Sequence, residues 1–100
     1  MTTRVVVTSE AAEQAHTIDD WWRRERTAAP NLFCEELASA FALLAGAPQA
    51  GRRYPHPAVP EIRRILLRST RYHVYDKIHE DDVIVLAVWN AVRGSGPGLK

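Results

Sequence analysis

The sequence predicts an α+β domain, in which an N-terminal strand and an αα-hairpin precede a three-stranded antiparallel meander. The period of the apolar residues changes along the chain and supports this order. Apolar side chains recur at helical spacing up to residue 46, and from residue 61 onward they follow the period of two that is typical of strands. Three and then four polar residues separate the later segments, and such short links require antiparallel neighbours.

The first 27 residues predict a strand followed by a helix. Residues 5–7 are a run of three valines, which we interpret as a strand covered on both faces. Thr8 and Ser9 follow with hydroxyls that can cap a helix N-terminus. The helix is expected to end near Thr27. Its apolar stripe consists of Ala11, Ala15, Ile18 and Trp22.

A second helix is predicted after Pro30, and Gly46 and Pro48 are expected to end it. Its core face carries Phe33, Leu37, Phe41 and Leu44. Cys34 lies among apolar neighbours on this helix, and we expect it to be a packed thiol rather than a nucleophile. The two helices therefore form an αα-hairpin with a short connection.

Residues 48–60 contain four prolines and predict one long irregular segment. The strands of the meander are predicted at residues 61–68, 72–78 and 83–90. The last of them is apolar on both faces, so we expect it to be central or covered. Residues 1–93 are predicted to form a single domain, and the glycine-rich residues 94–100 a flexible tail.

Composition and charge limit the classes of function. The first 50 residues carry four arginines and seven acids, a net −3, whereas residues 51–100 carry nine Lys or Arg and five acids, a net +4. This positive half fits an acidic protein surface or nucleic acid, and it fits a merely solvated face almost as well. A single cysteine excludes an internal disulfide, and the four histidines show no metal-ligand spacing, so no metal or cofactor is predicted. With no apolar run long enough for a signal peptide or a membrane span, we expect a cytoplasmic protein without membrane contact.

Two groups of residues are candidates for function. Alternation places Arg64, His73 and Tyr75 on a sheet surface, where such residues can bind phosphate or perform metal-free acid–base chemistry on RNA. The competing interpretation, which spacing alone favours, is a wet face with arginine stems covering apolar neighbours. Trp21, next to the stripe residue Trp22, lies either at the edge of the core, which we favour, or at the surface as an anchor for a partner.

Four segments taken together resemble the RelE/ParE toxin superfamily of type II toxin–antitoxin systems. They are Pro-Gln-Ala-Gly-Arg at 48–52, Arg-Ile-Leu-Leu at 64–67, Arg-Tyr-His-Val-Tyr at 71–75 and Val-Leu-Ala-Val-Trp-Asn-Ala-Val-Arg at 85–93. The order and spacing are most similar to the ParE, plasmid-stabilisation branch, although Asn90 stands where histidine is common in that branch. The likeness covers essentially the whole chain.

The resemblance implies the toxin of a toxin–antitoxin pair, which arrests growth and is silenced in a hetero-oligomer with a cognate antitoxin. ParE-type members inhibit DNA gyrase, whereas RelE-type members cut mRNA on the ribosome. Of the RelE-type nuclease residues, Arg64 and Arg93 match, but His73 occupies an arginine position, Leu66 replaces a lysine, and no tyrosine follows Tyr75. Gyrase inhibition without catalysis is therefore the preferred prediction, and an endoribonuclease or a degenerate, inactive toxin is the alternative.

These interpretations assign the following residues. Target binding is predicted for Arg64, Arg68, Arg71, His73 and Arg93, with the tail at residues 93–100 assisting. Under the nuclease alternative the catalytic residues would be Arg64, His73, Tyr75 and Arg93. Trp21 is the predicted antitoxin contact, either through an amphipathic segment laid over the helical hairpin or through a strand added to an open sheet edge.

Overall fold

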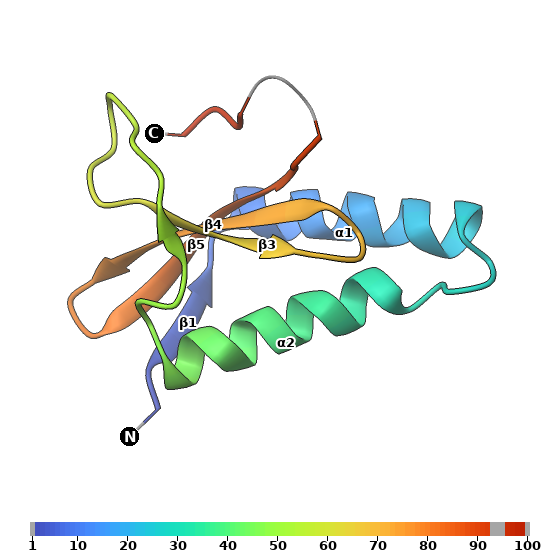
Figure 1. Ribbon diagram of the computed structural model, residues 1–100, viewed down its shortest axis with the longest axis horizontal. Coiled ribbons are helices and arrows are strands. Elements are labelled where there is room, and N and C mark those ends of the chain that lie inside the picture. The colour runs from blue at the N-terminus through green and yellow to red at the C-terminus, as the bar shows by residue number, and fades with distance from the viewer. Residues whose placement is uncertain (1, 93–95, 100) are drawn as a thin grey trace.

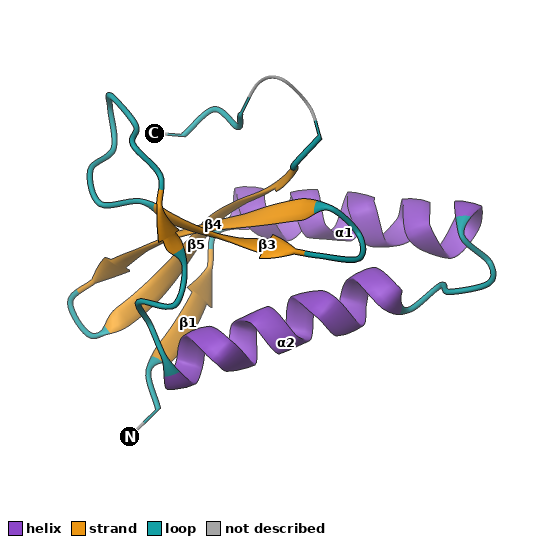
Figure 2. Ribbon diagram, in the orientation of Figure 1, coloured by secondary structure: helices purple, strands orange, loops and turns teal. Residues whose placement is uncertain are grey.

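The computed structural model describes residues 2–92 and 96–99, which form two helices and a five-stranded sheet (Figures 1 and 2). The helices are α1 (Ser9–Glu25) and α2 (Leu32–Gly46). The strands are β1 (Arg4–Val7), β2 (Arg52–Arg53), β3 (Arg63–Leu67), β4 (Tyr72–His79) and β5 (Asp82–Asn90). The predicted α+β fold, with its hairpin and meander, is confirmed.

The strand order in the sheet is β1-β5-β4-β3-β2. β1 pairs in parallel with the first half of β5, so that Arg4 lies opposite Asp82 and Val7 opposite Val85. β5 is therefore a central strand, as predicted. β1 forms the edge of the sheet, and Val7 is 36% exposed. The expectation that this strand is covered on both faces was wrong, because Val5 and Val6 are only half-buried and Val7 is exposed.

The segment predicted to be irregular contains the short strand β2. Arg52 and Arg53 of β2 pair with Arg64 and Arg63 of β3. The chain enters this pairing through Gly51, where a Cβ atom would lie 3.0 Å from the carbonyl oxygen of Arg64. Glycine is thus needed for a close backbone approach, and sequence periodicity does not reveal a strand of two residues.

A β-bulge divides β5 and was not predicted. Tyr75 of β4 lies opposite Ala87, while the next residue, Asp76, lies opposite Val85, so Leu86 is the extra residue. Val85, which precedes the bulge, and Val88, which follows it, both point into the core beneath the helices. Leu86 and Ala87 instead belong to the cluster on the opposite face. The bulge therefore re-aims the second half of β5 while keeping an apolar residue towards each face.

Two hydrophobic clusters lie on the two faces of the sheet. The helices run in opposite directions along one face, where the larger cluster is buried (Figure 1). Its buried members are Ala11, Phe33, Ala40, Leu67, Val74, Val85 and Val88. The smaller cluster on the other face contains Val59, Ile62, Tyr75 and Ala87, with Tyr54 and Leu99 packed against it. The loop before β3 and the described end of the chain thus cover part of the face that the helices leave open.

The helix termini lie close to the positions predicted from the sequence. The hydroxyl of Thr8 accepts a hydrogen bond from the amide of Ala11 at 3.2 Å and caps α1, as predicted. α1 ends at Glu25, two residues before the predicted end, and Gly46 is the last residue of α2. Within residues 2–92 and 96–99, neither helix is long and apolar enough to cross a membrane.

Cys34 is exposed, so the expectation of a packed thiol was wrong. Its neighbour Phe33 is 1% exposed and occupies the core side of α2. Consecutive helical residues point about 100° apart, which turns the cysteine side chain away from the core. Apolar neighbours in the sequence were a misleading signal here.

Candidate functional site

Three of the predicted site residues lie together on the sheet face opposite the helices. Arg64 of β3 is paired with Tyr75 of β4, and its Nη1 donates a hydrogen bond to the Tyr75 hydroxyl oxygen at 3.5 Å. The ring of His73 lies edge-on to that of Tyr75, with centroids 5.9 Å apart. Since side chains alternate along a strand, Ile65 and Val74 point to the helices and leave these three on the open face.

Tyr54, which sequence reasoning missed, completes this cluster. The Arg64 guanidinium carbon lies 4.8 Å from the centroid of the Tyr54 ring, a cation–π contact. The Tyr54 ring also meets Tyr75 edge-on, with 5.0 Å between centroids. The amide of Tyr54 donates to the carbonyl of Ile62 at 2.8 Å, which holds the loop against β3. A lone tyrosine in a proline-rich segment has no periodic pattern to mark it, so only the tertiary structure identifies it.

His73 lies between apolar neighbours on this face. Leu66 of β3 and Trp89 of β5 are its partners across the sheet. Burial is the main cause that lowers the pKa of His73, and the nearby positive charges of Arg64 and Arg71 lower it further. The imidazole is therefore neutral at neutral pH. It can accept a proton or a hydrogen bond, but it adds no positive charge to the surface.

The remaining predicted target-binding residues are more dispersed. Arg68 and Arg71 are exposed in the turn between β3 and β4. Arg71 adopts a φ of 66° and is near enough to His73 to affect its pKa, whereas Arg68 lines a groove of about 360 Å³ between α2 and β3. Arg93 lies outside the described residues. The structure thus gathers Arg64, His73 and Tyr75, and places two further arginines at one end of the meander.

The arginines of the meander are not held by carboxylates. Across residues 2–92 and 96–99, the arginines in ion pairs are Arg4, Arg23 and Arg24, all before the meander. Arg64 is bound by aromatic groups instead. The cationic side chains of this face are therefore available to an acidic partner.

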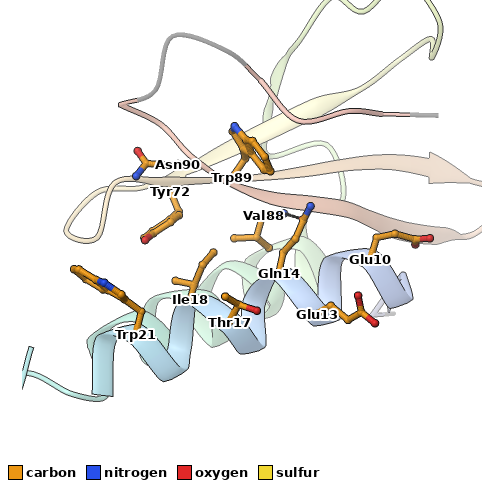
Figure 3. A pocket seen from close by; sticks show the side chains of 10 residues that line it. All are labelled: Glu10, Glu13, Gln14, Thr17, Ile18, Trp21, Tyr72, Val88, Trp89 and Asn90. Atoms are coloured by element: carbon orange, nitrogen blue, oxygen red, sulfur yellow. Dashed lines mark hydrogen bonds between the residues drawn. The ribbon is translucent and has the colours of Figure 1, made fainter. Parts of the chain in front are cut away.

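A groove separates α1 from the end of β5 (Figure 3). We call it the α1–β5 groove; it has a volume of about 750 Å³. Its lining residues are Glu10, Glu13, Gln14, Thr17, Ile18, Trp21, Tyr72, Val88, Trp89 and Asn90. Trp21 is 37% exposed at this groove, and its ring lies 5.9 Å from that of the core residue Trp22 in an edge-on contact. The Trp21 indole thus borders Trp22, carries the Arg26 guanidinium over its ring at 5.0 Å, and is partly exposed at the groove.

Asp76 is a second residue that sequence reasoning missed. It is 0% exposed, and neither carboxylate oxygen has a hydrogen-bond partner among the described residues. Burial raises the pKa of Asp76 to about 7, against a smaller opposing effect of the Arg63 charge. Asp76 follows Tyr75 in β4 and points to the opposite face, so it does not belong to the Arg64 cluster.

The described part of the chain contains no group of three or more His, Cys, Asp or Glu side chains placed to hold a metal ion. Arg64 supplies a fixed positive charge, His73 a neutral imidazole and Tyr75 a phenol hydroxyl.

Comparisons with known proteins agree with this architecture. Residues 5–93 match the family model described as the ParE toxin of the type II toxin–antitoxin system parDE. A chain of the chromosomal ParDE toxin–antitoxin system from P. aeruginosa superimposes with a TM-score of 0.69 at 15% identity, over 88% of this chain and 95% of that one. A mutant of the E. coli toxin RelE in the free state gives a TM-score of 0.59 at 19% identity, over 92% and 86%. No curated protein sequence matches.

Proposed function

Because the chain belongs to the ParE toxin family of type II toxin–antitoxin systems, we propose that it arrests growth by inhibiting DNA gyrase and that a cognate antitoxin neutralises it. The family match covers residues 5–93 and so includes both helices and the whole sheet except Arg4, the first residue of β1. We place the protein in the cytoplasm, where both partners would be met. The proposed target, partner and location rest on the family match and on the cationic and aromatic side chains of the open face.

The observation that carries the proposal is the composition of the open face. Arg64 is fixed by two tyrosines, and the cross-strand partners of its neighbour His73 are the large apolar residues Leu66 and Trp89. Aromatic and arginine side chains of this kind are enriched at protein–protein contacts. A cationic face whose arginine is held by aromatic side chains is better suited to binding a protein surface than to catalysis.

Supercoiling by purified gyrase tests this proposal. The intact protein should inhibit supercoiling, and Arg64→Ala should weaken the inhibition at least tenfold, since central interface arginines contribute about 2 kcal/mol or more. Arg24→Ala is the matched control, because it removes an exposed arginine from α1 on the other side of the molecule. Full supercoiling activity in the presence of excess intact protein would exclude gyrase as the target.

A ribosome-dependent mRNA endoribonuclease is the second candidate, and the contact between Arg64, Tyr75 and His73 favours it. The neutral His73 can accept the proton of a ribose 2′-hydroxyl while Arg64 neutralises the phosphate. Primer extension on translated messages would then show cleavage that His73→Ala abolishes and His79→Ala, at the exposed end of β4, preserves. Cleavage that survives His73→Ala would exclude this assignment.

Growth after induction separates both candidates from a degenerate toxin. An active toxin should stop growth when it is expressed alone and permit growth when the antitoxin is expressed with it. An inactive toxin retained only for binding would permit growth in both cases. We place the antitoxin contact at Trp21, on the opposite side of β5 from the open face.

A further inference from the structure

Four arginines lie together at the edge of the sheet where β2 pairs with β3. The register places Arg52 opposite Arg64 and Arg53 opposite Arg63. Residues directly opposite each other share a face of the sheet, with Cβ atoms roughly 4.5–5.5 Å apart. Since neighbouring residues of a strand point to opposite faces, one like-charge pair lies on each side of the same edge. We call these four residues the β2–β3 arginine cluster.

The like charges of the cluster are not balanced by carboxylates. The ion pairs of the described residues include none of the four arginines. Arg63 donates a hydrogen bond to the carbonyl of Gly51 at 3.4 Å, while Arg64 contacts the hydroxyl of Tyr75 and the ring of Tyr54. The two arginines of β2 are exposed. Like charges directly opposite each other destabilise a sheet, so an anion bound between them would relieve a repulsion that the fold itself leaves in place.

The cluster also accounts for the positive charge of the second half of the chain. Residues 51–68 contain five arginines and one acid, Glu61, a net +4, whereas residues 69–100 contain four Lys or Arg and four acids, a net zero. Asp76 lies opposite Arg63, but its carboxylate has no hydrogen-bond partner among the described residues, and burial raises its pKa to about 7. At neutral pH this carboxyl is only partly ionised, which leaves the cluster positive.

The edge of β2 adds a backbone donor between the two arginine pairs. The amide of Tyr54 faces β3 and donates to the carbonyl of Ile62 at 2.8 Å. Because amides alternate along an antiparallel strand, the amide of Arg53 is directed away from β3, and β2 is the last strand of the sheet in the described part of the chain. Guanidinium groups on both sides and an amide between them match an anion with several acceptor oxygens. β2 is only two residues long, so it offers too short a ladder for peptide binding by strand addition.

We propose that the β2–β3 arginine cluster binds the phosphate backbone of duplex DNA without reading its sequence. Arginine binds phosphate through two parallel hydrogen bonds, and duplex DNA presents one negative charge per about 1.7 Å of its axis. One phosphate lies between Arg52 and Arg64, and Arg53 and Arg63 contact the next two. The choice of DNA rests on the proposed function, since gyrase acts on DNA, whereas the phosphate site rests on the cluster alone.

Fluorescence anisotropy with the intact protein tests the proposal. The probe is a short labelled DNA duplex, and the comparison ligands are a duplex of unrelated sequence, an RNA duplex of the same sequence and poly-glutamate. Three phosphate contacts predict a slope of about −2.7 for log affinity against log salt, so the affinity for DNA should fall about fortyfold between 50 and 200 mM salt. The two DNA sequences should bind equally, and poly-glutamate and RNA should bind more weakly.

Variants of the cluster should weaken this binding selectively. Arg52→Gln with Arg53→Gln should lower the affinity roughly tenfold or more and make the salt slope shallower by about one to two. Arg24→Gln with Arg26→Gln removes the same charge from the end of α1 and should change neither quantity. Arg52→Lys with Arg53→Lys should keep most of the slope and lose affinity, because lysine lacks the guanidinium fork. Urea unfolding of the glutamine pair guards against a folding defect, since loss of cross-strand repulsion should leave the midpoint unchanged or raise it.

The outcomes separate this inference from the proposed function. Binding that is insensitive to salt, an equal loss in the α1 variant, or poly-glutamate that binds as tightly as DNA would each overturn the inference, and a lowered urea midpoint would show that the fold needs these arginines and would count against it. An RNA duplex that binds more tightly than DNA would overturn the choice of DNA. If DNA binds as expected but gyrase is not inhibited, the proposed function fails and the phosphate site stands; inhibition of gyrase without DNA binding has the reverse meaning.

Discussion

Replacing Asp76 with asparagine should stabilise the protein at alkaline pH. Asp76 lies in the middle of β4, between Arg63 of β3 and Val85 of β5, with no solvent exposure. A carboxylate in such a position loses its hydration without gaining hydrogen bonds. The asparagine side chain has the same shape and cannot ionise. The substitution therefore removes the cost of the buried charge and little else.

The pKa of Asp76 sets the size and the sign of the effect. Its pKa rises from 3.8 to about 7 on folding, a difference of about three units at 1.36 kcal/mol each, or about 4 kcal/mol. Because the folded state holds the proton more tightly, stability falls as the pH rises from the unfolded pKa to the folded one. About 3 kcal/mol of this loss lies between pH 5 and pH 8. That is a large share of the ~5–15 kcal/mol that stabilises a typical domain.

Urea unfolding followed by circular dichroism at pH 5 and pH 8 measures this effect. The unmodified protein should lose stability between the two pH values, whereas Asp76→Asn should lose much less and should be more stable at pH 8 by roughly 2–4 kcal/mol. Asp81→Asn changes an exposed aspartate in the turn before β5 and is the control. If Asp76→Asn is no more stable than the unmodified protein at pH 8, the side chain is hydrated or paired and the reasoning fails.

Three further substitutions test individual contacts. Glu36→Ala should destabilise the fold by about 1–2 kcal/mol in urea unfolding at pH 7, because Glu36 accepts three hydrogen bonds from Ser69 and Thr70 at 2.7–2.9 Å. Burial raises the pKa of Glu36, but the hydrogen bonds together outweigh burial and lower the pKa below its usual value. The stabilisation by Glu36 should therefore be present at neutral pH and disappear in acid. A Glu36→Ala variant as stable as the unmodified protein at pH 7 would argue against the contact. Thr8→Ala should reduce the unfolding free energy by about 1 kcal/mol through loss of the α1 cap, with Thr8→Ser restoring most of it. Gly51→Ala should speed amide hydrogen exchange in β2 and β3, because the new Cβ meets the Arg64 carbonyl oxygen, and unchanged exchange would contradict the close approach.

Most of the secondary structure could be predicted from the sequence because its periodicity is strong. The helix around Phe33 and Leu44 carries a regular apolar stripe, and both residues are buried as expected. The central place of β5 followed from its apolar character on both faces. These elements depend on local patterns, which a sequence displays directly.

The features that escaped prediction depend on distant parts of the chain. The parallel pairing of β1 with β5 joins residues at opposite ends of the sequence, and the bulge at Leu86 interrupts no local pattern. The environment of Asp76 was missed for the same reason, because its burial is created by other strands and by the helices. For Cys34 a local pattern was misleading: its apolar neighbours in the sequence suggested a buried side chain, but its position on the helix leaves the side chain exposed.

The candidate site was predicted in its strands but not in its surroundings. Strand alternation was enough to place Arg64, His73 and Tyr75 on one face. Tyr54 reaches Arg64 from a loop whose course depends on tertiary contacts, so no spacing rule could identify it.

The pairing of β1 with β5 means that the sheet cannot be completed until the chain has been synthesised through β5. Arg4 and Asp82, which join the two strands by a salt bridge of 2.6 Å, are 78 positions apart. β1 has β5 as its one neighbour and β4 has β5 on one side, so a translation product that stops before Asp82 leaves β1 without a partner and one edge of β4 open. Termination or cleavage before β5 should therefore yield a fragment that cannot complete the sheet, and only a polypeptide that extends through β5 can acquire the surface on which any harm to its host would depend.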